Sequence, residues 1–108
     1  MIAHRCGRAY GPDSSRPALA AALTGGRLGG VETDVCITHD GALVCLHDTY
    51  LPLSSTVTGW AHERSAADVL AGQLLDGLGR ASGQRPLLLD ELLDLVPPTL
   101  TVQLDVKA

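Results

Sequence analysis

Two acidic side chains, Glu32 and Asp34, stand two residues apart in a largely apolar stretch of the sequence. Side chains alternate between two faces along a β-strand, so both carboxylates are predicted to share one face, with Val31 and Val35 on the other. No lysine or arginine occurs between residues 28 and 63. Neighbouring carboxylates repel each other unless a metal ion or a distant basic residue lies between them. The spacing leaves two alternatives, a cation-binding site and a solvated strand face.

Further polar residues are predicted at the ends of other strands, namely His4 with Arg5, His47, and Asp105 with Lys107. A third carboxylate beside the first two would make an all-oxygen site, which suits Mg²⁺ or Ca²⁺ better than Zn²⁺. Two histidines beside it could act as acid and base, and cationic side chains suit an anionic substrate such as a phosphodiester. The alternatives are hydrogen-bonded strand-end histidines and a simple ion pair between Asp105 and Lys107.

The elements that must position these residues follow from periodicity and turn residues. Strands are predicted over residues 2–5, 31–37, 43–46 and 100–107, and helices over residues 18–23, 65–73 and 88–96. The short link at Asp40-Gly41 favours an antiparallel strand pair. The last strand alternates, with Val102, Leu104 and Val106 on a predicted apolar face. A strand with helices on one side and a polar mouth on the other is typical of an α/β barrel.

Composition excludes several classes of function. The net charge is −4 and no basic run is present, which argues against a nucleic-acid partner. No apolar run approaches the ~20 residues of a membrane span, and the N-terminus lacks the pattern of a signal peptide, so a cytoplasmic location is predicted. The three cysteines do not have zinc-site spacing, and Cys36 and Cys45 are predicted to be buried in apolar strands.

Taken together, the motifs resemble the glycerophosphodiester phosphodiesterase family. The family's first strand contains Ala-His-Arg-Gly, followed by Gly-Pro-Glu-Asn-Thr and a helix. Its core signature is Glu-x-Asp-Val, then Thr-x-Asp-Gly, then a strand that ends in His-Asp. The corresponding segments here are residues 3–6 (Ala-His-Arg-Cys), 11–15 (Gly-Pro-Asp-Ser-Ser), 32–35 (Glu-Thr-Asp-Val), 38–41 (Thr-His-Asp-Gly) and 47–48 (His-Asp). The resemblance covers essentially the whole chain.

The resemblance implies a fold and an activity. The fold would be α/β, the N-terminal part of a TIM (β/α)₈ barrel, with residues 1–108 forming a partial phosphodiesterase domain. The activity would be metal-dependent hydrolysis of a small-molecule glycerophosphodiester to glycerol 3-phosphate and an alcohol. The cofactor would be a divalent cation, Mg²⁺ or Ca²⁺.

The resemblance also implies roles for seven residues. The metal ligands would be Glu32, Asp34 and Asp105; the catalytic acid/base pair would be His4 and His47; and the phosphate contacts would be Arg5 and Lys107. Three departures from the family pattern bear on this site. Residues 13–15 (Asp-Ser-Ser) replace the family's Glu-Asn-Thr, which implies a change in a supporting substrate or metal contact. Cys6 replaces a glycine beside His4 and Arg5, and Asp105 is one methylene shorter than the usual glutamate.

A complete (β/α)₈ barrel takes about 250 residues, whereas this chain has 108. We therefore expect a barrel truncated after about the fourth strand, with weak or no activity as an isolated chain and self-association through its open edges. Two alternative functions remain. One is a phospholipase D-like phosphodiesterase that acts on a lysolipid head group, and the other is a non-catalytic half-barrel that serves as an interaction module.

Overall fold

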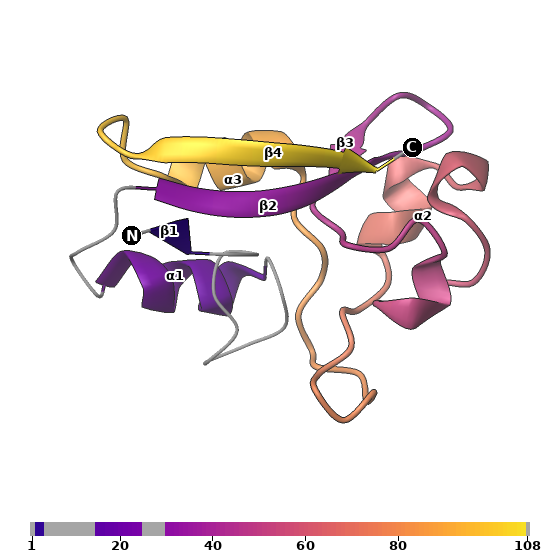
Figure 1. Cartoon of the computed structure of the whole chain (residues 1–108). Helices are drawn as coiled ribbons and strands as arrows, with labels where there is room; N and C mark the ends of the chain where they lie inside the picture. The colour runs from indigo at the N-terminus through magenta and orange to yellow at the C-terminus, as the bar shows by residue number, and fades with distance from the viewer. Residues whose placement is uncertain (1, 4–14, 25–29, 108) are drawn as a thin grey trace.

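The computed structural model describes residues 2–3, 15–24 and 30–107, and its central element is strand β2 (Gly30–Ile37). Strand β4 (Thr101–Lys107) runs parallel to β2 over its whole length, from Gly30 opposite Thr101 to Cys36 opposite Lys107. On the other edge, β1 (Ile2–Ala3) pairs in parallel with the start of β2, and β3 (Leu43–Val44) pairs antiparallel with its end. Figure 1 shows β4 and β2 side by side as the long strands of the sheet.

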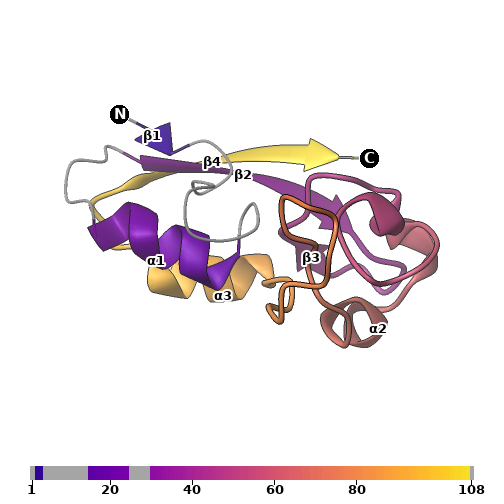
Figure 2. The same ribbon diagram turned by 90° about the horizontal axis from the view of Figure 1, so that it is seen from below.

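Two helices cover one face of this sheet. Helices α1 (Arg16–Thr24) and α3 (Leu89–Leu95) lie on the same side of β2 and β4 (Figure 2). Val31 and Val35 of β2 are fully buried against Leu19 of α1 and Leu92 of α3. Because side chains alternate along a strand, Glu32 and Asp34 must face the opposite side. Packing of the apolar face therefore presents the carboxylates on the face away from the helices.

The structure has the α/β arrangement predicted for the first part of a TIM barrel. Strands and helices follow one another along the chain, and α1 and α3 lie on one face of the sheet (Figure 2). β4 is the fourth strand along the chain, as predicted. Four strands are described, but β3 is antiparallel, so β1, β2 and β4 are the ones that run parallel as barrel strands do. β4 is thus the third of the described strands that run parallel.

The turn between β2 and β3 matches the expectation from Asp40-Gly41. Gly41 has φ of +82°, a conformation that suits glycine, and the Thr38 N–H donates to the carbonyl of Ala42 at 2.9 Å. The Asp40 carboxylate accepts a hydrogen bond from the Thr38 hydroxyl at 2.5 Å and another from the Ala66 N–H at 3.0 Å. These two bonds, the Thr38 one first, lower the pKa of Asp40. The turn therefore also holds the start of helix α2 (Ala66–Leu70).

Helix α2 is shorter than predicted. Ser65 caps it as expected by accepting the Asp68 N–H at 3.2 Å. The prediction that the helix reaches residue 73 is wrong. Gly72 lies so close to Val57 that a Cβ there would be 2.3 Å from the valine side chain, and the N–H of Gln73 donates to the Thr56 hydroxyl at 3.0 Å. Contacts with the preceding loop end the helix.

Helix α3 and strand β4 are less deeply buried than their apolar patterns predict. The helical period of residues 88–96 predicts Leu92, Leu95 and Val96 on one apolar side. Leu89, Leu92 and Val96 are buried, whereas Leu95 is 37% exposed. On β4, the core cluster reaches Val102, and the strand's next apolar residues, Leu104 and Val106, are 46% and 55% exposed. The helices therefore cover the start of β4 and leave its end open.

A second core cluster lies beyond the sheet, around β3 and α2. Its buried members are Cys36, Val44, Leu46, Leu51, Ala61, Val69 and Leu74. Single-turn 3₁₀ helices at Leu51–Leu53 and Ala61–Glu63 fold the segment between β3 and α2 over this cluster. That segment is therefore more ordered than the long loop that its polar composition predicts.

We predict that Gly30→Ala destabilises the sheet, because an added Cβ would lie 2.3 Å from the carbonyl oxygen of Thr101. The expected loss is about 1–3 kcal/mol of unfolding free energy, the usual cost of overpacking. Urea unfolding followed by circular dichroism measures it. Gly77→Ala is the matched control, since a Cβ added at Gly77 would have no other atom within 4 Å. Equal losses in the two variants would contradict the close β2–β4 approach.

A further prediction concerns Glu91, the third residue of α3. Its carboxylate accepts hydrogen bonds from Arg85 and from the N–H of Leu88, and these lower its pKa to about 2. Because the folded state favours the ionised form, Glu91 stabilises the folded state. This contribution to the unfolding free energy is complete above the ordinary pKa of 4.5 and is lost as the pH falls through about 2. We expect Glu91→Gln to cost about 1 kcal/mol near pH 7, a modest value because solvent screens the exposed Arg85, and to cost only a small part of that at pH 2. Thermal melts from pH 2 to pH 7 measure this, with the exposed Asp94 as control in Asp94→Asn. A loss of melting temperature in Glu91→Gln that is the same at every pH would contradict a stabilising role of the ionised carboxylate.

Candidate active site and metal centre

Three carboxylates meet on the face of the sheet away from the helices. Each of Glu32, Asp34 and Asp105 offers an oxygen, and these oxygens all lie within 4.8 Å of one another. The β2–β4 register explains the meeting, because Asp34 is paired directly with Asp105 and Glu32 is one alternation earlier on the same face. Residues more than 70 positions apart in the sequence thus form one acidic cluster.

Lys107 is the cation nearest to this cluster among the described residues. Its ammonium lies 2.8 Å from Asp105 Oδ2 and 3.6 Å from Asp34 Oδ1. The hydrogen bond from Lys107 is the main cause of the lowered pKa of Asp105, and the same bond raises the pKa of Lys107. Asp34 is nearly buried, with 4% of its side chain exposed, while 57% of Asp105 is exposed. Among the residues that the structure describes, three carboxylates lie beside one lysine ammonium, and their oxygens could hold a divalent cation.

The donor set fits such an ion. Carboxylate oxygens are the ligands that Mg²⁺ and Ca²⁺ prefer, and a sheet face that leaves Asp105 exposed gives an ion a path from solvent. Thiols do not belong to the set. Burial raises the pKa of Cys36 and of Cys45 to about 11, so both are neutral thiols at physiological pH. Both are fully buried, as predicted.

His47 lies just after β3, at the end of the sheet where β2 and β4 finish. Its Nδ1 is 3.2 Å from Asp48 Oδ1, and the other oxygen of Asp48 accepts a hydrogen bond from the Ser54 hydroxyl at 2.5 Å. His47 also contributes, after Lys107 and Asp34, to lowering the pKa of Asp105. His47 is therefore within electrostatic reach of the acidic cluster.

The structure brings together five of the seven predicted site residues: Glu32, Asp34, His47, Asp105 and Lys107. His4 and Arg5, with Cys6 beside them, lie outside the described residues. Lys107 contacts two of the carboxylates, and its contact with phosphate stays a prediction. Two residues near His47 that the prediction did not include form a chain of contacts with it. Asp48 follows His47 in the His-Asp motif, which was a usable signal, whereas nothing in the sequence marks Ser54 among the serines and threonines of its loop.

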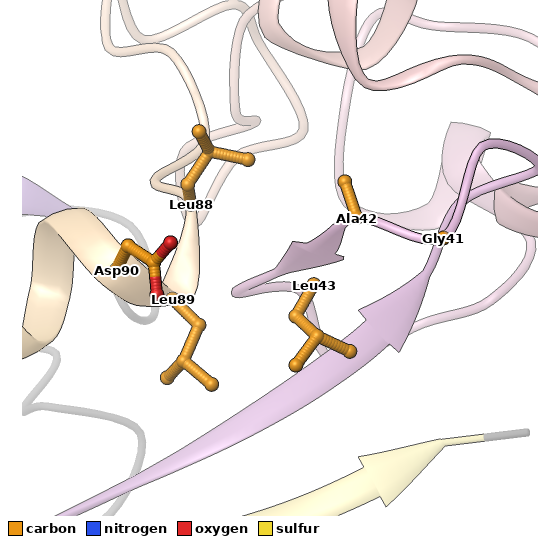
Figure 3. Close-up of a pocket in the computed structure, with 6 residues that line it drawn as sticks. All are labelled: Gly41, Ala42, Leu43, Leu88, Leu89 and Asp90. Atoms are coloured by element: carbon orange, nitrogen blue, oxygen red, sulfur yellow. The ribbon is translucent and has the colours of Figure 1, made fainter.

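A separate hollow lies away from this cluster, between the turn before β3 and the start of α3 (Figure 3). Its volume is about 270 Å³, and it is lined by Gly41, Ala42, Leu43, Leu88, Leu89 and Asp90. One carboxylate among mostly apolar groups has no acid/base or metal-binding partner in this lining. The chemistry-bearing residues are on the sheet face and not in this hollow.

The comparisons with known proteins agree on one family. Residues 4–107 match the model of the glycerophosphoryl diester phosphodiesterase family. The chain belongs to this family. A curated relative, the Probable glycerophosphodiester phosphodiesterase 1 of Mycobacterium tuberculosis, is 44% identical over 59 residues, which cover 55% of this chain and 21% of the relative. The chain therefore spans about a fifth of the curated relative it matches.

Solved structures show the same kinship. A glycerophosphoryl diester phosphodiesterase from Parabacteroides distasonis superposes with a TM-score of 0.87 at 26% identity, over 98% of this chain and 37% of that protein. A glycerophosphodiester phosphodiesterase from Agrobacterium tumefaciens gives a TM-score of 0.85 at 25% identity, over 99% and 46%. These relatives are TIM barrels, so the fold described above is the corresponding part of a TIM barrel.

We predict that Lys107→Met raises the pKa of Asp105 above its wild-type value, because the main cause of its lowering is the hydrogen bond from Lys107. A titration of the Asp105 carboxyl carbon by NMR measures the change. Arg80→Met serves as control, since the Arg80 guanidinium contacts Asp76 instead. An Asp105 titration that is unchanged in Lys107→Met and in the control would contradict the ion pair.

Proposed function

We propose that this chain provides metal-binding and acid/base residues for hydrolysis of a glycerophosphodiester to glycerol 3-phosphate and an alcohol. The observation that carries the proposal is the meeting of Glu32, Asp34 and Asp105 within 4.8 Å, beside His47, in a member of this family. A phosphodiesterase from Oleispira antarctica, whose structure contains the product sn-glycerol-3-phosphate, matches this chain with a TM-score of 0.79 at 26% identity, over 98% of this chain and 43% of that protein. That kinship supports the substrate class.

In this proposal, Glu32, Asp34 and Asp105 would hold Mg²⁺ or Ca²⁺. The bound ion would offset the negative charge of the phosphate oxygens and polarise the phosphorus centre. Lys107 would add a positive charge at the edge of the site, which favours an anionic substrate. Since its ammonium now contacts Asp105 and Asp34, a phosphate contact would require Lys107 to leave these carboxylates.

His47 would move the proton. Nδ1 lies 3.2 Å from Asp48 Oδ1, so Nε2 is the ring nitrogen that would accept or donate the proton. The second histidine of the pair, His4, and the phosphate contact of Arg5 stay predictions. So does the cytoplasmic location. Within residues 2–3, 15–24 and 30–107, no helix is long and apolar enough to cross a membrane.

Self-association through β4 is a further part of the proposal. Among the described residues β4 pairs with β2 alone, and its Leu104 and Val106 are about half exposed. An exposed edge strand with apolar side chains is a template for pairing with another strand. This observation supports self-association of the 108-residue chain, but it gives no support to a non-catalytic role. The comparisons name glycerophosphodiester enzymes and give no support to the lysolipid alternative.

Metal binding by the 108-residue chain tests the proposal directly. We expect excess Ca²⁺ or Mg²⁺ to raise the melting temperature, because an ion that binds the native state selectively stabilises it. Glu32→Gln is expected to abolish this rise, since it removes a charged ligand. His47→Ala is expected to keep it, because His47 contributes no ligand to the cluster. If neither cation changes the melting temperature of the wild-type chain, the metal-site part of the proposal is wrong.

Turnover is tested with glycerophosphocholine, by measuring the glycerol 3-phosphate released. The chain spans less than half of its solved relatives, so we expect weak hydrolysis by these 108 residues alone. Any metal-dependent hydrolysis is expected to fall about 10²–10⁴-fold in His47→Ala, the usual contribution of a general acid or base. Full activity in His47→Ala would refute its catalytic role.

A further inference from the structure

The Asp48 carboxylate is held at both of its oxygens. Oδ1 lies 3.2 Å from His47 Nδ1, and Oδ2 accepts the Ser54 hydroxyl at 2.5 Å. About a third of the His47 side chain and of the Asp48 side chain is exposed, so water competes for both groups. A carboxylate turns readily about its last side-chain bond. The bond from Ser54 restricts that rotation, and a hydrogen bond to a charged acceptor is a strong one.

The backbone of the loop determines where the Ser54 hydroxyl lies. Ser54 ends the 3₁₀ helix Leu51–Leu53, and its N–H donates to the carbonyl of Leu51 at 3.1 Å. Its own carbonyl accepts the Leu75 N–H at 2.8 Å. Leu51 is fully buried and donates its N–H to the carbonyl of Gly59 at 2.9 Å. Ser54 is thus tied on both sides to a packed loop, and it reaches back six residues to Asp48.

We propose that Ser54 is a positioning residue that acts on His47 through Asp48. By holding Asp48 with Oδ1 toward the imidazole, it keeps the proton of neutral His47 on Nδ1 and leaves Nε2 as the proton-exchanging atom. The hydrogen bond made by one ring nitrogen selects the tautomer. A free imidazole in water prefers the proton on Nε2. The protein must therefore stabilise the Nδ1–H tautomer of His47 for that form to dominate. The functional meaning rests on the proposed role of His47, but the tautomer itself does not.

The test is the tautomer of His47, read from the two nitrogen shifts of ¹⁵N-labelled histidine in the 108-residue chain at alkaline pH, where imidazoles are neutral. His47→Gln assigns its signals among the four histidines. We expect the wild-type His47 to carry its proton on Nδ1. In Ser54→Ala, we expect the two nitrogen shifts to move toward the values of the Nε2–H tautomer.

Two further variants separate the hydroxyl from packing. Ser54→Thr keeps the hydroxyl and Ser54→Val replaces it with a methyl group of similar shape, so both carry the same packing change. We expect Ser54→Thr to retain the Nδ1–H tautomer and Ser54→Val to lose it. Ser82→Ala, which removes a hydroxyl bonded to Gln84 elsewhere, is expected to change nothing.

Two results would overturn the inference. One is a wild-type His47 with its proton on Nε2, and the other is the same tautomer in Ser54→Thr and Ser54→Val. Neither result depends on a metal or a substrate. The inference can therefore fail while the metal-binding and turnover experiments succeed, and it can hold while they fail.

Discussion

The parallel register of β2 and β4 is the constraint on which the candidate site depends. Pairing Asp34 with Asp105 brings together two carboxylates that are 71 positions apart, and it places Lys107 diagonally across from Asp34. The close approach at Gly30 and Thr101 fixes where this pairing begins. A slip of one residue would turn Asp105 to the helix side and put Val106 in its place. The arrangement of the three carboxylates is thus a consequence of strand pairing.

The burial of the opposite face makes this register stable. Val31 and Val35 pack under α1 and α3, so β2 cannot rotate without exposing them. The cost of this arrangement is a concentrated negative charge on the other face, where Asp34 is nearly buried. Lys107 offsets part of that charge in the chain itself. A divalent ion would compete with Lys107 for Asp105 and Asp34, which ties metal affinity to the position of one lysine side chain.

Much of the fold could be predicted from the sequence because its signals are local. The alternation of residues 31–37 predicts a strand with carboxylates on one face, and the Asp40-Gly41 turn predicts the antiparallel partner. Errors arose where tertiary contacts override local preference. The end of α2 depends on Val57 approaching Gly72, and the buried side of α3 depends on which leucines meet the sheet. The candidate site was predicted in part through family motifs, while Ser54 required the folded loop.

The sequence alone determined the family, the residue types available for chemistry and the face on which Glu32 and Asp34 lie, since alternation along a strand is a property of the local backbone. Tertiary structure decided which distant residues join them. Asp105 reaches the cluster only because β4 pairs with β2 in one register, and Ser54 reaches Asp48 only because buried Leu51 holds its loop. The physical reason is that register and loop closure come from packing between distant segments, and no local pattern encodes either.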